Sequence, residues 1–321
     1  MRDLCECDEG DRCTVEDIML HFSFIEFLVV CGSIVLVAFL LSEILECSGL
    51  ISCGGRHKSN IIYGYSNHNG PDTWINHFPH CGGENQSPIN INTCQAIVVN
   101  PSDALEWDNY TVAPYFMNIT NDGHTVKVTG EWPCGLWPTL RGGPMRAHEE
   151  YEFHSMLFHW GLSDEEGSEH TLNGNGFSME LQMVHVRKGC TAPQDAIFDD
   201  AADSLVIISF LFKVVPVDNA LLDHLVNNLW QISAPGSTVQ IPSFPLSYVS
   251  SPFEHGYYTY SGSLTHPPCC ENVIWIIKPE TLPISSSELT QFRTLTSDDG
   301  PMFNNSRPVQ QLNGRDVFFY D

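Results

Sequence analysis

The sequence predicts a mainly β domain that follows an N-terminal extension. Two largely apolar runs, residues 151–160 and 179–186, are separated by a polar loop with several glycines. A third run, 205–211, is apolar almost throughout, which is typical of a central strand buried on both faces. Turns rich in proline or glycine, at 132–135 and 141–144, separate shorter runs. These features predict a sheet with short helices.

The first 60 residues have a different composition from the rest of the chain. Residues 1–17 are acidic, carry three cysteines without a recognised zinc spacing, and are expected to be disordered. Residues 18–42 are mostly apolar. A membrane-spanning helix needs about 20 apolar residues and a signal-peptide core about 7 to 15, so either a transmembrane signal-anchor or a signal peptide fits. A linker at 43–60 then leads to one domain at 61–321.

Shorter elements follow in chain order. Residues 96–99 and 125–128 are rich in β-branched side chains and predict strands. Between 218 and 230, leucines recur at helical spacing and predict a helix. The paired runs 151–160 and 179–186 predict two neighbouring buried strands.

Alternation along these two strands predicts which side chains share a face. Leu157 and His159 point together, whereas Phe158 points away. On the second strand Glu180, Gln182 and Val184 share a face. His154 and His185 stand at odd separations from His159 and Gln182, so in regular strands both are expected to face away.

Three stretches of the chain carry recognisable motifs. The first is QSPINI at 86–91, preceded by Gly-Tyr at 64–65 and Asn-Gly-Pro at 69–71; the second is 151–186; the third is SLTHPPC at 263–269. In this order, the three stretches resemble the α-class carbonic anhydrases. The resemblance extends over residues 61–321. It implies the α-carbonic anhydrase fold, with a central twisted, largely antiparallel sheet of about ten strands and short peripheral helices.

The resemblance also identifies where this chain departs from active members of the family. Those members hold zinc with two histidines on one strand and a third on its neighbour, and the matching positions here are Leu157, His159 and Gln182. Leucine has no lone pair to offer, and a glutamine amide is a weak zinc donor. His159 is the only retained ligand, so no zinc cofactor is expected.

Other family positions are kept. Thr265 and Glu169 match the hydroxyl and buried carboxylate that orient the zinc-bound hydroxide, and His124 matches the proton relay. Glu180 matches a carboxylate that orients the third histidine, whereas Ser155 replaces an amide that supports the first strand. The family's pocket corresponds to Val184, Ile207, Leu264, His266 and Trp275, which suit a protein core equally well.

Cysteines and glycosylation sequons indicate the compartment. Cys81 and Cys269 match the two cysteines that extracellular members join in a disulfide, although Cys270 could replace Cys269. The partners of Cys94, Cys134, Cys190 and Cys270 stay open. Sequons begin at Asn109, Asn118 and Asn304. We therefore expect a glycoprotein on the extracellular side, either as a single-pass membrane protein or in secreted form.

Charge excludes one class of partner. The chain has 14 Lys and Arg against 39 Asp and Glu, a formal net charge of −25. A nucleic-acid backbone would be repelled by such a surface. The expected partner is an extracellular protein that the sequence does not identify, with contact to the membrane through residues 18–42 if that segment is not cleaved.

Two functions are compatible with these observations. The first is that of a carbonic anhydrase-related protein, which keeps the fold without CO2 hydration and serves as an extracellular binding domain. The pattern LNGxxFSxExQ, at 172–182, resembles such proteins. The alternative is a zinc-dependent lyase that hydrates CO2 at a rearranged site built from His159, His124 and His266.

Overall fold

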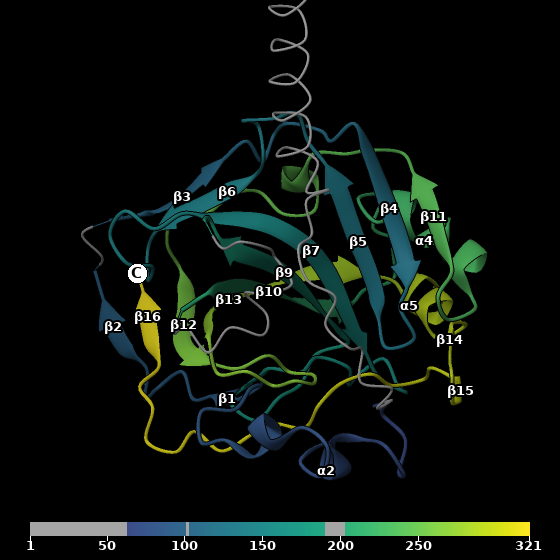
Figure 1. Ribbon diagram of the computed structural model, residues 1–321, viewed down its shortest axis with the longest axis horizontal. Helices are drawn as coiled ribbons and strands as arrows, with labels where there is room; N and C mark the ends of the chain where they lie inside the picture. Colours follow the sequence, from purple (N-terminus) through teal and green to yellow (C-terminus); the bar gives the residue numbers. More distant parts are fainter. Residues whose placement is uncertain (1–62, 101–102, 190–202) are drawn as a thin grey trace, which may run out of the picture. The chain divides into compact units, whose positions relative to one another are not determined.

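The computed structural model describes residues 63–100, 103–189 and 203–321 (Figure 1). The expected segments 1–17, 18–42 and 43–60 lie outside these ranges, as does Cys190. No helix of the described residues is long and apolar enough to cross a membrane.

A mixed sheet of twelve strands forms the centre of the described chain. Ten strands follow one another in the order β11-β4-β5-β7-β9-β10-β13-β12-β16-β2 (Figure 1). Their bounds are β2 (Ile97–Val99), β4 (Phe116–Asn121), β5 (Val126–Glu131), β7 (Tyr151–Trp160), β9 (Met179–Arg187), β10 (Leu205–Val214), β11 (Thr238–Ile241), β12 (Tyr257–Gly262), β13 (Val273–Ile284) and β16 (Phe318–Tyr320). The remaining two, β3 (Leu105–Asp108) and β6 (Thr139–Gly142), pair with each other, and β6 also pairs with β7.

Most neighbouring strands in this sheet are antiparallel, as predicted. The exceptions are the parallel pairs β10–β13 and β16–β2. The five strand predictions at 96–99, 125–128, 151–160, 179–186 and 205–211 correspond to β2, β5, β7, β9 and β10. The mainly β prediction is therefore confirmed, and the pairing of β7 with β9 is antiparallel.

Short elements surround the sheet. The helices are α2 (Pro71–Trp74), α4 (Asp223–Val226) and α5 (Ser286–Phe292), with 3-10 turns η1 (Pro79–Gly82), η2 (Leu229–Ile232) and η3 (Leu246–Tyr248). Two small ribbons pair β1 (Asn90–Ile91) with β8 (Thr171–Leu172) and β14 (Thr296–Ser297) with β15 (Gly300–Pro301).

The prediction of a single helix over 218–230 is wrong. Helix α4 ends at Val226, and the 3-10 turn η2 follows. At the break, the Asn228 amide donates to the His224 carbonyl at 2.9 Å. Asparagine side chains compete in this way with backbone hydrogen bonds and weaken a helix interior.

Two hydrophobic cores are formed by opposite faces of the central strands. Phe158 and Ile208 belong to the larger core. Leu157, Val184 and Ile207 belong to the second core, on the face where the predicted site lies. Alternation along each strand thus assigns neighbouring residues to different cores, as expected for side chains that project to opposite faces.

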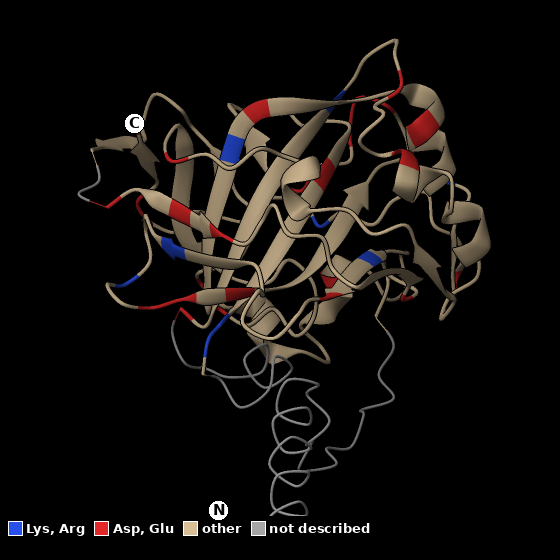
Figure 2. Ribbon diagram, turned by 90° about the horizontal axis from the view of Figure 1, so that it is seen from above, with Lys and Arg blue, Asp and Glu red and all other residues tan. Residues whose placement is uncertain are grey.

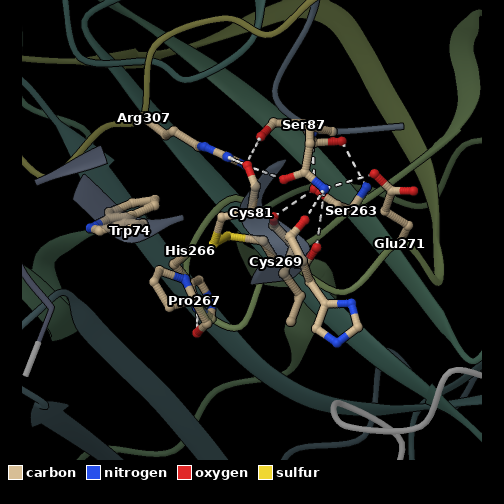
Figure 3. Close-up of a disulfide and its surroundings, with 12 residues drawn as sticks. Trp74, Cys81, Ser87, Ser263, His266, Pro267, Cys269, Glu271 and Arg307 are labelled. Carbon is tan, nitrogen blue, oxygen red and sulfur yellow. Dashed lines mark hydrogen bonds between the residues drawn. A yellow bond between two sulfur atoms is a disulfide. The ribbon is translucent and has the colours of Figure 1, made fainter. Parts of the chain in front are cut away.

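A disulfide joins Cys81 to Cys269 across a separation of 188 residues (Figure 3). The pairing implied by the resemblance is confirmed, and Cys270 is buried next to it in the chain. The Arg307 guanidinium lies beside the disulfide and donates to the Cys81 carbonyl at 3.1 Å and the Ser87 carbonyl at 2.8 Å. It also stacks over Trp74, with its central carbon 5.5 Å from the ring centroid.

Acidic residues outnumber basic ones on the described chain. In Figure 2 the few Lys and Arg positions are scattered singly among Asp and Glu positions. This view shows no continuous basic stripe.

Candidate functional site

The register of β7 and β9 brings the predicted ligand positions together. Leu157 is paired with Gln182, and His159 with Glu180. All four side chains are buried, on the face that holds the second core. The arrangement expected from the resemblance is therefore present in its backbone geometry.

His159 is held in one orientation by a single hydrogen bond. Its Nδ1 lies 2.9 Å from the Asn305 carbonyl oxygen. A carbonyl can only accept, so Nδ1 carries the hydrogen and donates to it. The residue is 1% exposed, and Nε2 has no hydrogen-bond partner among the described residues.

Glu180 is the most fully hydrogen-bonded carboxylate of the site. It accepts from His170 Nδ1 and the His170 amide, each at 2.8 Å, and from the Glu169 amide and Ser209 Oγ, each at 2.9 Å. Burial acts to raise its pKa, but the charge and hydrogen bonds of His170 outweigh burial and lower the pKa to about 2. Glu180 is thus ionised at neutral pH.

Glu169 is bound differently from what the resemblance implies. It accepts from Gln182 Nε2 at 2.7 Å and from the Arg307 amide at 2.9 Å. Thr265 lies close enough to lower the pKa of Glu169, yet Thr265 Oγ1 has no hydrogen-bond partner of normal geometry among the described residues. Burial and the charge of Glu180 raise the pKa of Glu169. Gln182 therefore supplies a hydrogen bond to Glu169 that the resemblance does not imply.

These contacts test whether the site fits zinc. The amide nitrogen of Gln182 donates to Glu169 and also to Glu180, at 3.1 Å, so this group presents hydrogen atoms rather than a lone pair. Leu157 offers no donor atom, and His159 alone cannot hold a zinc ion. No group of three or more His, Cys, Asp or Glu in the described ranges could hold a metal. The residues present do not fit the family's metal.

A cavity of about 100 Å³ lies over these residues. Its wall contains four histidines, which are His124, His154, His159 and His266. Lys127 also lines it, and Leu157, Val184 and Leu264 form its apolar part. Of the five predicted pocket residues, Val184, Leu264 and His266 line the cavity, whereas Ile207 and Trp275 are packed in the second core.

His154 faces the cavity, so the prediction that it faces away is wrong. The pairing of β7 with β9 shifts register between Phe153 and Ser155, which is a β-bulge. One extra residue at a bulge reverses the alternation of side chains. The prediction for His185 is confirmed, because its Nε2 hydrogen-bonds Tyr110, a residue of the larger core. Ser155 Oγ lies 2.9 Å from His154 Nδ1.

Burial disfavours the charged form of three of the cavity histidines, His124, His154 and His266. It lowers the pKa of His154 and of His266 to about 4. Burial also lowers the pKa of His124, although nearby carboxylates such as Asp122 oppose the effect. On the cavity wall, the Tyr63 ring stacks on His124 with ring centroids 3.9 Å apart and lies nearly parallel to His266 at 6.4 Å.

Two further residues support the site and were not predicted. His170 bridges Glu180 and the Tyr260 hydroxyl, at 2.8 and 2.7 Å. Asn305 orients His159 through its carbonyl, and its side chain accepts from the Trp160 amide at 2.8 Å. His170 adjoins Glu169 in the sequence, which is a usable signal, whereas nothing local marks Asn305.

The predicted glycosylation sites differ in exposure. Asn304 is exposed, whereas Asn109 and Asn118 are half-buried. The Asn109 amide donates to the Trp137 carbonyl at 3.2 Å. Glycosylation at all three positions stays a prediction.

Comparison with known proteins identifies the family. A family model for eukaryotic-type carbonic anhydrases matches residues 69–321. The chain belongs to this family. It is 35% identical to mouse carbonic anhydrase 1, in a match that covers 79% of this chain and 97% of that protein. It is 33% identical to bovine carbonic anhydrase 3, over 79% of this chain and 96% of that protein.

A relative with a different kind of name has the same percentage identity to this chain as mouse carbonic anhydrase 1. The rat carbonic anhydrase-related protein is 35% identical, over 74% of this chain and 84% of that protein. Overall sequence identity therefore does not distinguish carbonic anhydrases from carbonic anhydrase-related proteins as relatives of this chain. The side chains of the site have to separate them.

Proposed function

We propose that this chain is a carbonic anhydrase-related protein that does not hydrate CO2 and serves as a binding domain outside the cell. The observation that carries the proposal is the hydrogen bonding of Gln182. Its amide fills the third ligand position with N–H groups that donate to Glu169 and Glu180. Leu157 removes a second ligand position.

The loss of two of the three ligand positions bears directly on catalysis. Hydration of CO2 at neutral pH depends on a metal ion that lowers the pKa of its bound water to about 7. His159 Nε2 has no hydrogen-bond partner within the described part of the chain, and one imidazole does not replace the ion. Glu169, Thr265 and His124 match family positions whose roles require a metal ion, and they do not supply one.

An extracellular location is supported by the Cys81–Cys269 disulfide, since disulfides persist in oxidising compartments. The sequons at Asn109, Asn118 and Asn304 agree with that location. Residues 18–42 would act as a signal peptide or an anchor. The net charge of −25 disfavours nucleic acid and leaves an extracellular protein as the proposed partner.

The zinc content of the purified protein, measured after dialysis together with CO2 hydration, tests this function. Mouse carbonic anhydrase 1, purified in the same way, is the positive control. We expect less than a tenth of an equivalent of zinc and a hydration rate equal to that of buffer. Stoichiometric zinc with hydration that is lost in His159→Ala would overturn the proposal and favour the rearranged lyase.

A further inference from the structure

We propose that Asn304 carries an N-linked glycan and that the first sugar of this glycan packs against Phe303 in a surface hollow. This inference rests on the extracellular location in the proposed function, because N-linked glycans are carried by secreted proteins and domains outside the cell. The sequon predicts only the attachment, whereas the surroundings of Asn304 indicate where the sugar lies.

The amide nitrogen of Asn304, to which the sugar is attached, is available. Asn304 is exposed, and its Oδ1 accepts from the Ser306 hydroxyl at 2.7 Å and the Ser306 amide at 3.4 Å. Its Nδ2 donates to no acceptor among the described residues. By contrast, the half-buried Asn109 uses its Nδ2 to donate to the Trp137 carbonyl at 3.2 Å. A glycan on Asn304 therefore displaces no internal contact.

Asn304 lines a hollow of about 240 Å³. The hollow is separate from the cavity over His159 but shares Tyr63, Tyr65 and His124 with its wall. A volume of about 150 Å³ accommodates benzene, so the hollow has room for one sugar ring. A sugar attached to Asn304 thus has a place to lie against the protein.

Phe303 gives the hollow an apolar surface. Its side chain is 49% exposed, lines the hollow and directly precedes Asn304 in the chain. A sugar ring has an apolar face of C–H groups, and covering the phenyl ring with it removes apolar surface from water. Because the sugar is tethered to the next residue, its effective concentration at the ring is high.

Two carboxylates give the same hollow hydrogen-bond acceptors. Asp298 and Asp299 form the exposed turn between β14 and β15, and both line the hollow. Asp299 accepts from Asn69 Nδ2 at 2.6 Å, whereas Asp298 has no hydrogen bond among the described residues. The hydroxyl and acetamido N–H groups of the first sugar are donors that suit the free carboxylate.

Occupancy of the sequon is the first test. The full chain is produced in eukaryotic cells, and glycopeptides from the purified protein are assigned by mass spectrometry. We expect glycan on Asn304. Protein recovered from outside the cell with Asn304 unmodified would overturn the inference and leave the extracellular location standing. Protein that stays in the cytosol without any glycan would refute that location and remove the basis of the inference with it.

Thermal unfolding tests the contact with Phe303. Asn304→Gln removes the glycan and should lower Tm by about 2 °C, whereas trimming the glycan to its first sugar with an endoglycosidase should leave Tm unchanged. In a Phe303→Ala background, Asn304→Gln should cause no further loss, since the sugar no longer has a ring to cover. Leu162→Ala, at another exposed apolar side chain, is the matched control background and should leave the loss undiminished.

An equal loss on Asn304→Gln in the parent and in Phe303→Ala would overturn the inference, because it would assign the effect to the hydrogen bonds between Asn304 and Ser306. A loss on trimming as large as the loss on complete removal would also overturn it. In that case the outer sugars, and not the first one, would make the stabilising contact.

Discussion

Gln182 differs from histidine in the number of hydrogens that its nitrogen carries. Its Nε2 has two, and both acceptors next to it are buried carboxylates, Glu169 and Glu180. A histidine in this place could donate Nδ1–H to Glu180 and direct Nε2 into the cavity. The surrounding carboxylates therefore remain suited to an imidazole, although the present residue uses them as hydrogen-bond acceptors.

The first prediction follows from this difference. The double variant Leu157→His, Gln182→His should bind about one equivalent of zinc, because the two new imidazoles face each other across β7 and β9 and His159 Nε2 is already free. Elemental analysis after dialysis measures the result. Either single variant should retain much less zinc, since two histidines leave the ion weakly held.

Adding His159→Ala to the double variant is the control, and it should remove the zinc. A double variant without zinc would contradict the prediction. It would mean that the groups around the site no longer orient an imidazole at position 157, where Ser155 stands in place of the family's amide and pairs with His154.

The second prediction concerns His185, which is buried against Tyr110. Burial lowers its pKa from 6.5 to about 3. The unfolded chain therefore binds a proton below pH 6.5 that the folded chain does not, and stability present above pH 6.5 is lost as the pH falls towards 3. The contribution of His185 to this loss between pH 7 and pH 5 is about 2 kcal/mol.

Urea unfolding at pH 7 and pH 5 measures this contribution. His185→Phe should be less stable than the parent at pH 7, because the Tyr110 hydroxyl loses its partner, but its loss on acidification should be smaller by about 2 kcal/mol. His77→Phe, at an exposed position, should lose as much as the parent. Equal losses in all three proteins would show that His185 titrates normally.

At the scale of elements, alternation predicted most of the site and failed at one strand. The alternation of side chains along a strand placed Leu157 and His159 on one face and His185 on the opposite face, as observed. It misplaced His154, because a bulge leaves no mark in the residues 151–160 themselves. The leucines at 218–230 mark a buried face correctly, but Asn228 ends helical hydrogen bonding that the leucine spacing alone would continue.

Helix α5 carries the third prediction. Ser285 caps it by accepting from the Glu288 amide at 3.1 Å, while the Glu288 carboxylate accepts from the Ser285 amide at 2.8 Å. Ser285→Ala should lower the free energy of unfolding by about 1–2 kcal/mol, because an amide at the helix N-terminus loses its acceptor. Urea unfolding measures it.

Ser287→Ala is the matched control, since it removes a hydrogen bond to Asp218 at 3.0 Å and leaves the cap intact. Its loss should be clearly smaller. Equal losses would assign the effect to the contacts of Asp218 and not to the cap.

At the scale of the whole molecule, the site depends on segments that are remote in sequence. Asn305 and His159 are 146 residues apart, and the Arg307 amide reaches Glu169 over a separation of 138. The Arg307 side chain continues to the Cys81 and Ser87 carbonyls. Local sequence patterns carry no information on such pairs. Neither the contact of Asn305 with His159 nor the bond from Gln182 to Glu169 could therefore be predicted from them. The resemblance to the family was what identified the ligand positions as one site.

The Cys81–Cys269 disulfide is the covalent part of this long-range connection and carries the last prediction. It closes a loop of 188 residues, so it removes much of the conformational entropy of the unfolded chain. Cys81→Ala with Cys269→Ala should lower the free energy of unfolding by about 3–5 kcal/mol in urea. Cys94→Ala, at an exposed thiol, should leave stability unchanged. If the double variant were as stable as the parent, the hydrogen bonds of Arg307 would be sufficient to hold these segments together, and the disulfide would have no measurable part in the stability of the fold.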